Sequence, residues 1–136
     1  MHPLHTYIVE DSQVIRDNLI ATLEELAPVQ VIGSAEDENT AVAWLTRNDA
    51  AVDLVIVDIF LKQGSGLGVL RSAQHRAGLC SVVVLSNYAT PDIRRKCLAL
   101  GADHVFDKST EIDALLAHCD ALARGKPSAH SANTGR

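Results

Sequence analysis

Short runs of apolar residues alternate along the chain with segments whose apolar residues recur at every third or fourth position. The apolar runs predict strands, and the segments with helical spacing predict amphipathic helices. The predicted strands cover residues 6–9, 30–34, 54–57, 81–85 and 104–106, and the predicted helices cover residues 13–26, 39–47, 67–76, 91–101 and 111–123. Strand and helix therefore alternate five times, with a turn at residues 64–66.

Within each predicted helix, the spacing indicates which side chains face the core. In the first helix, Ile15, Leu19, Leu23 and Leu26 form one stripe, and Ser12 is a suitable N-cap. In the fourth helix, Pro91 suits the first turn and Gly101 the end. The inward residues of the others are expected to be Ala41, Trp44 and Leu45 in the second helix, Leu67, Leu70 and Ala73 in the third, and Ile112, Leu115, Leu116, Cys119 and Leu122 in the fifth.

The alternation of strand and helix predicts an α/β fold, because right-handed crossovers bring successive strands into one parallel sheet. A common strand order at this size is 2-1-3-4-5, a doubly wound five-stranded sheet with five helices and flavodoxin-like topology. The third strand is apolar at successive residues, which fits a central strand covered on both faces. Residues 1–124 are expected to form this single domain, and residues 125–136, which lack apolar periodicity, a disordered tail.

Charged or hydroxyl residues follow four of the predicted strands: Glu10 and Asp11, then Asp58, Ser86 and Lys108. The carboxyl ends of parallel strands meet at one edge of the sheet, where ligands bind. Three carboxylates, an ammonium and a hydroxyl at this edge are typical of a small magnesium and phosphoryl site, with Asp11 and Asp58 as direct ligands and Glu10 acting through water. Lys108 is expected to pair with Asp58. The alternative is that the acidic pair is a solvated helix N-terminus, where acidic side chains are favourable.

Composition limits the partners. The formal net charge of -5 and the 4% content of aromatic residues argue against a nucleic-acid surface, so we expect neither DNA nor a membrane as a partner. The three cysteines form no CxxC motif and the N-terminal residues do not resemble a signal peptide, which together predict reduced thiols in a cytoplasmic protein. No apolar run approaches the roughly 20 residues of a membrane span.

Residues 6–122 resemble the receiver domain of bacterial two-component response regulators. The matching positions are Glu10 and Asp11 for the metal-binding pair, Asp58 for the phosphoacceptor, Leu61 and Gly66 for the stretch after it, Ser86 for the switch hydroxyl and Lys108 for the site lysine. The resemblance implies Mg²⁺ as the cofactor, with the main-chain carbonyl of Phe60 as a further ligand. It also implies that Asp58 accepts a phosphoryl group from a sensor histidine kinase or a histidine phosphotransfer protein.

The chain departs from the family pattern near the site. Lys62 and Ser109 stand where the family has prolines, and Asn87, beside the phosphoryl pocket, stands where it has a small residue. Val105 occupies the position of the switch aromatic, with Phe106 one residue later. The run from Phe106 to Ser109 is similar to the ending of some receiver domains. We therefore interpret the chain as a Phe-Asp-Lys-Ser-type variant that keeps every chemically active residue.

The resemblance predicts a single-domain response regulator that is not an enzyme beyond its own phosphorylation and dephosphorylation, and that signals through a downstream protein effector. No DNA-binding helix-turn-helix is expected after Ala123. The basic residues Arg94 and Arg95 are interpreted either as a solvated face or, with Val105 and Phe106, as part of a switch and output surface for an acidic partner.

Other functions of the same fold are weighed against this one. A pseudo-receiver would signal without phosphate, which the departures at Asn87 and Val105 favour. A magnesium-dependent aspartyl phosphohydrolase needs a second acid near its nucleophile, and Phe60 stands at that position. A flavin-binding domain needs a phosphate-binding loop after the first strand, where Glu10 and Asp11 would repel the phosphate.

Overall fold

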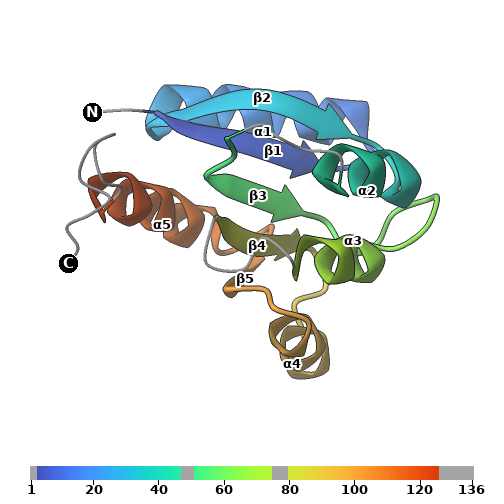
Figure 1. Ribbon diagram of the computed structural model, residues 1–136. Coiled ribbons are helices and arrows are strands. Elements are labelled where there is room, and N and C mark those ends of the chain that lie inside the picture. The colour runs from blue at the N-terminus through green and yellow to red at the C-terminus, as the bar shows by residue number, and fades with distance from the viewer. Residues whose placement is uncertain (1–2, 47–50, 75–79, 126–136) are drawn as a thin grey trace.

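Five parallel strands form one sheet in the order β2-β1-β3-β4-β5, with helices on both faces (Figure 1). The computed structural model describes residues 3–46, 51–74 and 80–125. Its elements are β1 (Leu4–Val9), α1 (Gln13–Leu26), β2 (Val29–Ala35), α2 (Glu38–Thr46), β3 (Leu54–Val57), α3 (Gly66–Ala73), β4 (Ser81–Ser86), α4 (Pro91–Ala99), β5 (His104–Asp107) and α5 (Ile112–Gly125). The predicted fold class and strand order are confirmed.

Alternate side chains of the strands enter two separate cores. In β3, Val55 and Val57 join the core beneath α2, α3 and α4, whereas Leu54 and Ile56 join the core beneath α1 and α5. All four side chains are at most 1% exposed. The continuous apolar run therefore marks a central strand that is covered on both faces, as predicted.

Helix ends follow the local signals in the sequence. The Oγ of Ser12 accepts a hydrogen bond from the main-chain N–H of Ile15 at 3.3 Å, which confirms the predicted N-cap of α1. Pro91 opens α4 behind Thr90, and Gly101 follows its end with a φ of 102°, a left-handed conformation that glycine adopts without strain.

The inward face of α1 differs from the predicted stripe. Leu19 and Leu23 are buried, but Ile15 is 38% exposed and Leu26, the last residue of the helix, is 59% exposed. Arg16 is buried in their place, because its guanidinium has a main-chain carbonyl and a carboxylate within hydrogen-bonding distance. These two oxygen acceptors satisfy the guanidinium, so Arg16 can be buried where the apolar spacing predicted that Ile15 would be.

The other predicted faces and boundaries need smaller changes. Trp44 and Leu67 are only partly buried at the edge of a core, and Trp44 stacks on Tyr7 with ring centroids 3.9 Å apart. Gly125 belongs to α5 and not to the tail as predicted, because the last turn of the helix includes it. The predicted helix ends at residues 47 and 76, and the predicted tail from residue 126, lie outside the described residues.

Two of the three cysteines lie in the cores. Cys97 and Cys119 are buried, and burial, reinforced by the carboxylate of Asp120, raises the pKa of Cys119 to about 11. Burial also raises the pKa of Cys97, so both thiols stay protonated at neutral pH, as expected for core residues. Within the described ranges, no helix combines the length and apolar character needed to cross a membrane.

Candidate functional site

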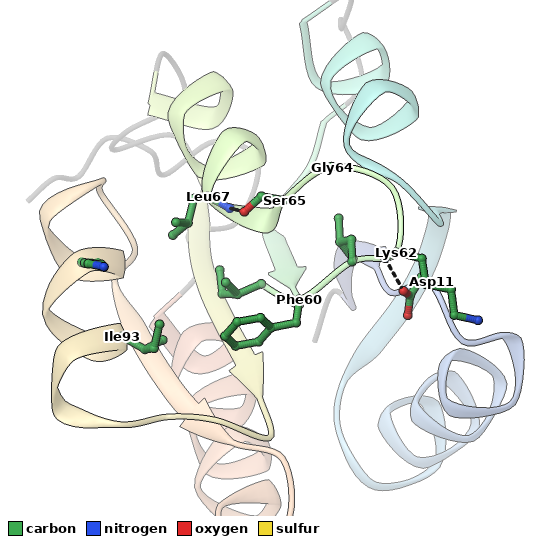
Figure 2. Close-up of a pocket in the computed structure, with 10 residues that line it drawn as sticks. Asp11, Phe60, Lys62, Gly64, Ser65, Leu67 and Ile93 are labelled. Carbon is green, nitrogen blue, oxygen red and sulfur yellow. Dashed lines mark hydrogen bonds between the residues drawn. The ribbon is translucent and has the colours of Figure 1, made fainter.

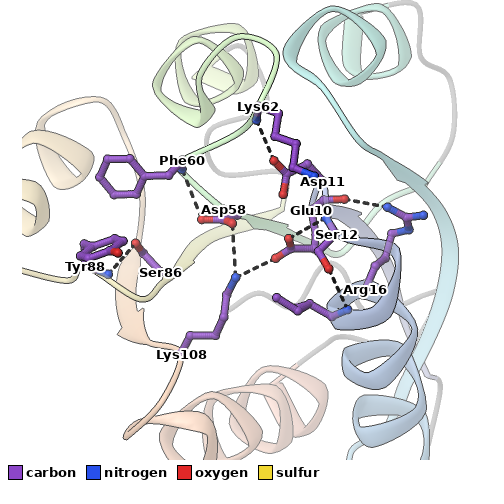
Figure 3. Close-up of polar contacts among 11 residues, drawn as sticks. Glu10, Asp11, Ser12, Arg16, Asp58, Phe60, Lys62, Ser86, Tyr88 and Lys108 are labelled. Carbon is purple, nitrogen blue, oxygen red and sulfur yellow. Dashed lines mark hydrogen bonds and ion pairs between the residues drawn. The ribbon is translucent and has the colours of Figure 1, made fainter.

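Strand register brings the predicted site residues to one edge of the sheet. Val9 at the end of β1 pairs with Val57 at the end of β3, and β3 pairs in turn with β4. The residues that follow these strands therefore come together. One oxygen from each of Glu10, Asp11 and Asp58 lies within 4.8 Å of the other two, and Figure 3 shows the three carboxylates gathered beyond the strand ends.

Lys108, the residue after β5, pairs with two of these carboxylates. Its Nζ lies 2.7 Å from Oε1 of Glu10 and 3.2 Å from Oδ2 of Asp58 (Figure 3). Glu10 is 2% exposed and Asp58 is 8% exposed, so water screens these charges little. The predicted pairing of Lys108 with Asp58 is present in the structure. The shorter contact with Glu10 adds a partner that the sequence did not indicate.

Burial and neighbouring charges shift the pKa values of Asp58 and Lys108. Burial raises the pKa of Asp58 above its usual value; the ammonium of Lys108 opposes this shift, and the carboxylate of Glu10 adds to it. Burial alone would lower the pKa of Lys108, but its hydrogen bond to Glu10 and the charge of Asp58 outweigh burial and raise it. The site therefore favours a bound cation beside its carboxylates.

Glu10 is held from two sides. Its Oε2 accepts a hydrogen bond from the main-chain N–H of Ser12 at 3.0 Å. Nη1 of Arg16 donates to the main-chain carbonyl of Glu10 at 2.8 Å, and Nη2 pairs with Glu36 at 3.2 Å. Sequence reasoning missed Arg16, which stands one position away from the predicted stripe. The sequence signal that could have identified Arg16 is a basic residue three positions before Leu19, which places it on the same side of the helix.

The three carboxylates differ in the hydrogen bonds that their oxygens already accept. Both oxygens of Glu10 accept hydrogen bonds. Asp11 is partly exposed and accepts one hydrogen bond through Oδ2, from the main-chain N–H of Lys62 at 2.7 Å. Oδ1 of Asp58 accepts a longer one, at 3.3 Å, from the main-chain N–H of Phe60. A hard divalent cation that takes one or two carboxylates together with water and phosphate oxygens fits this donor set.

Ser86, the last residue of β4, is fully buried beside the acidic group. Its Oγ accepts a hydrogen bond from the main-chain N–H of Tyr88 at 3.1 Å, and its carbonyl accepts the main-chain N–H of Lys108 at 2.9 Å. Asn87 is exposed. The ring of Tyr88 meets that of Phe60 edge to face, with centroids 5.3 Å apart and both rings about half exposed or more. Sequence reasoning missed this pair, because Tyr88 lies in a loop without periodicity.

A sequence model described as the response regulator receiver domain matches residues 6–120. The chain belongs to this family. A protein of Picosynechococcus sp. strain PCC 7002, named a probable transcriptional regulatory protein, is 33% identical over an alignment of 122 residues that covers 86% of this chain and 48% of that protein. The receiver domain spans about half the length, or less, of the curated relatives it matches, and some of those relatives are named as protein-glutamate methylesterases.

Solved structures agree with this fold. The signal receiver domain of NarL from Mycobacterium tuberculosis has a TM-score of 0.78 and 18% identity, with 93% of this chain and 100% of that chain covered. The CheX–CheY–BeF3–Mg²⁺ complex from Borrelia burgdorferi has a TM-score of 0.76 and 20% identity, with 90% of each chain covered. At these identities, the likeness shows the fold alone. Receiver domains bind Mg²⁺ at an acidic pocket, and the group of Glu10, Asp11 and Asp58 could hold a metal ion.

An open pocket of about 490 Å³ lies beside the acidic group of the receiver domain. Figure 2 shows it between α4 and the loop that follows β3. Phe60, Leu67 and Ile93 give the pocket an apolar lining, and Lys62 and Asp11, a member of the acidic group, line it on the side away from Leu67 and Ile93. The receiver domain therefore presents an apolar surface directly beside its carboxylates.

Gly66, at the start of α3, passes close to the main chain at the end of β3. Its N–H donates to the carbonyl of Ile59 at 2.9 Å, and a Cβ at this position would overlap the main-chain carbonyl of Asp58. Only a residue without a side chain lets the loop approach Asp58 this closely. The lack of space for a Cβ therefore explains why a glycine stands at this position.

We expect Gly66→Ala to destabilise the receiver domain by about 1–3 kcal/mol, because main-chain atoms on both sides of the overlap must shift. Thermal unfolding should show a Tm lower by several degrees. Gly125→Ala is the matched control, since a Cβ at that position meets nothing within 4 Å. Its Tm is expected to equal or slightly exceed that of the wild type. Equal Tm values for the two variants would contradict the steric explanation.

The predicted output residues of β5 are not on the surface. Val105 is 7% exposed and faces the core beneath α2, α3 and α4, and Phe106 is 8% exposed and faces the opposite core. The sequence suggested that they belong to a switch and output surface, and the alternation of side chains along a strand buries one of them on each face of the sheet. A role for either residue in switching stays a prediction.

The basic cluster on α4 is divided between two directions. Arg95 and Lys96 both pair with Asp92 on their own helix, at 2.7 and 3.4 Å, and are solvent-exposed. Arg94 points away from them, toward β5 and the start of α5. The interpretation as a solvated face therefore describes Arg95 and Lys96 but not Arg94.

Proposed function

We propose that Asp58 accepts a phosphoryl group from a phosphohistidine, on a sensor histidine kinase or a histidine phosphotransfer protein. Mg²⁺ would be bound by Asp11, Asp58 and the main-chain carbonyl of Phe60, with Glu10 acting through water. The observation that carries this proposal is the meeting of three carboxylates and the ammonium of Lys108 at the carboxyl edge of the sheet. Membership of the receiver family, whose domains bind Mg²⁺ at an acidic pocket, supports the same chemistry.

The transfer exchanges one bond to phosphorus for another. An oxygen of Asp58 forms the new bond, the bond between phosphorus and the histidine nitrogen breaks, and its electron pair leaves with the imidazole, which then takes up a proton. Bound Mg²⁺ neutralises negative charge on the carboxylates and the phosphoryl oxygens. Lys108 is within reach of the transferred group, because its Nζ already contacts Asp58. The hydroxyl of Ser86 provides a second donor at the end of the adjacent strand.

Exposed apolar residues beside the site fit docking of the phosphohistidine donor. Val14 and Ile15, in the first turn of α1, are 70% and 38% exposed. A pocket of about 210 Å³ continues from Ile15 to Lys108 and Ile112. A helix that carries a phosphohistidine could cover this apolar surface while its imidazole reaches Asp58.

Output through protein contacts follows from the chemistry of the surface. The net charge of -5 and the low aromatic content support a protein effector and not DNA or a membrane as the partner of this domain. Some relatives are transcriptional regulators and others methylesterases, in which the matched region is part of a longer chain. We propose that this receiver domain acts in the cytoplasm through a protein effector, without an enzymatic activity of its own beyond phosphorylation and dephosphorylation of Asp58.

Incubation with Mg²⁺ and acetyl phosphate, followed by intact-mass measurement, tests the proposal. The expected result is the addition of one phosphoryl group, with acetate as the leaving group, and no addition when EDTA removes the metal. Phosphoramidate, which carries its phosphoryl group on nitrogen as phosphohistidine does, is the second donor. The absence of an adduct with both donors at saturating Mg²⁺ would contradict the proposed function.

A further inference from the structure

One guanidinium ties together three segments that surround the proposed phosphoryl site. Nε of Arg94, on α4, donates to the main-chain carbonyl of Ala89 at 3.0 Å. Nη1 donates to the main-chain carbonyl of Val105 at 2.8 Å, and Nη2 pairs with Oε1 of Glu111 at 2.7 Å. We call Arg94 and these three acceptors the Arg94 latch. Its members come from the loop after β4, from β5 and from the residue before α5.

An arginine suits this position because β5 is an edge strand. On the side away from β4, the main-chain carbonyls of β5 have no partner strand in the described sheet. The planar guanidinium can satisfy such a carbonyl and also donate to two more acceptors, which a lysine ammonium on its flexible stem does less well. The side chains of Arg94 and Glu111 are only 37% and 36% exposed, so this contact is more than a fully solvated ion pair.

One end of the latch is joined to the turn that carries Lys108. Oε1 of Glu111 accepts a second hydrogen bond, at 2.7 Å, from the main-chain N–H of Asp107. Oδ1 of Asp107 accepts the hydroxyl of Ser109 at 2.7 Å and its main-chain N–H at 2.8 Å, which makes the turn rigid. The hydrogen bond from Arg94 lowers the pKa of Glu111 most, and the hydrogen bond from the main-chain N–H of Asp107 adds to this effect, so the carboxylate stays charged. A displacement of Lys108 is therefore transmitted to Glu111.

The other end of the latch is joined to Ser86. Ala89 lies three residues after Ser86, and the Oγ of Ser86 holds the intervening loop through the main-chain N–H of Tyr88 at 3.1 Å. The main-chain N–H of Lys108 donates to the carbonyl of Ser86 at 2.9 Å, so the two ends also meet directly. Both donors of the proposed phosphoryl site, Ser86 and Lys108, thus lie on segments that Arg94 restrains.

We propose that Arg94 is a positioning residue that couples the phosphoryl site to the surface formed by α4, β5 and α5, and that the latched geometry opposes phosphorylation. This inference rests on the proposed function of Asp58. In the structure, Lys108 contacts Glu10 and Asp58, and the Oγ of Ser86 accepts from Tyr88. Lys108 already contacts Asp58, whereas the Oγ of Ser86 is held by the main-chain N–H of Tyr88, so Ser86 is the donor that has to turn toward a phosphoryl group on Asp58. The loop after β4 moves with Ser86, and the carbonyl of Ala89 moves away from Nε of Arg94.

The coupling has a defined sign. A ligand shifts an equilibrium only by its different affinities for the two states, and the coupling acts equally in both directions. If phosphorylation opens the latch, then removal of the latch favours the phosphorylated geometry. Opening also separates the guanidinium of Arg94 from the carboxylate of Glu111, at a surface where a partner protein can bind them.

Beryllofluoride with excess Mg²⁺ serves as an equilibrium probe of the phosphorylated geometry. Titration is followed by the amide resonances of Tyr88 and Asp107, the donors to Ser86 and Glu111. We expect Arg94→Ala to bind beryllofluoride about fivefold more tightly, or better, than the wild type. Arg94→Lys keeps the charge but not the fork, and is expected to resemble Arg94→Ala. Arg95→Ala is the matched control, since Arg95 is the next residue, its replacement removes the same charge, and its ion pair is with Asp92 on its own helix.

A second readout does not depend on the phosphoryl mimic. Hydrogen exchange of residues 86–90 and 105–111 should be faster in Arg94→Ala than in Arg95→Ala. The two variants should otherwise have equal thermal stability. Equal or weaker beryllofluoride binding by Arg94→Ala, or unchanged exchange in both segments, would overturn the latch. Failure of the wild type itself to bind beryllofluoride would instead contradict the proposed function, and the coupling with it.

Discussion

Asp58→Asn is expected to abolish phosphoryl incorporation and to raise the thermal stability of the receiver domain at neutral pH. An asparagine amide offers no anionic oxygen to attack phosphorus, so no acyl phosphate forms. Stability rises because burial raises the pKa of Asp58, which means that the folded environment disfavours the ionised form. The uncharged side chain of the same shape removes this penalty and leaves Lys108 paired with Glu10.

The stability gain is expected to depend on pH. The pKa of Asp58 in the folded state lies above its ordinary value of 3.8, so the unfolded state releases this proton first as the pH rises. Wild-type stability falls across the interval between the two pKa values and stays lower above it. The difference between Asp58→Asn and the wild type should therefore be absent below pH 3.8 and complete above the folded-state pKa.

Thermal unfolding across this pH range and intact-mass measurement with acetyl phosphate check the two effects together. Asp120→Asn removes the same charge from an exposed position on α5 and should leave phosphoryl incorporation intact. Continued incorporation in Asp58→Asn would show that another residue is the phosphoacceptor. A Tm that falls at neutral pH would contradict the assignment of Asp58 as a carboxylate destabilised by burial.

The fold could be predicted because its signals are local. The four apolar residues of β3 and the serine, proline and glycine at helix ends act within a few residues of where they stand. The meeting of Asp58 with Glu10 and Asp11 could be predicted as well, since parallel strands in this order end at one edge. Strand ends and topology together were sufficient to bring the acidic residues to one place.

Contacts that depend on side-chain reach could not be predicted in this way. Arg16 and Arg94 look like exposed cations in a helical pattern, but each guanidinium binds a main-chain carbonyl that no residue type reveals. The acceptors of Arg94 lie 5, 11 and 17 residues away in sequence, in three different segments. Such positions become visible only when the loops are placed in space.

The same limit explains the output residues. Val105 and Phe106 were considered for a switch and output surface because they stand at and next to the position of the family's switch aromatic, and the pleat of β5 turns both side chains into cores. The main-chain carbonyl of Val105, on the side of β5 away from β4, accepts a hydrogen bond from Arg94. At this edge of the sheet, the main chain therefore carries the contact that the sequence assigned to side chains.

Lys108→Ala is expected to slow phosphorylation by acetyl phosphate about 10²–10³-fold, the usual effect of losing one donor to the charge that develops in transfer. It should also lower the free energy of unfolding by about 3–5 kcal/mol, because Glu10 and Asp58 are left buried without their cation. The pKa of Lys108 is raised in the folded state, so its contribution is complete below its ordinary value of 10.5 and is lost as the pH rises through the folded-state value. The stability difference from the wild type should therefore shrink at strongly alkaline pH.

Intact-mass time courses and urea unfolding measure these two effects, and Lys62→Ala is the matched control. Lys62 lies beside the same site, but its side chain is exposed and its contact with Asp11 is made by the main-chain N–H, which alanine keeps. Lys62→Ala is expected to match the wild type in both measurements. A wild-type rate in Lys108→Ala would show that Lys108 only neutralises Glu10, and that Ser86 and the metal suffice for transfer. Asp58→Asn already prevents phosphorylation, so the double variant Lys108→Ala, Asp58→Asn reports on stability alone, and restored stability there would show that the ammonium stabilises the fold by neutralising Asp58.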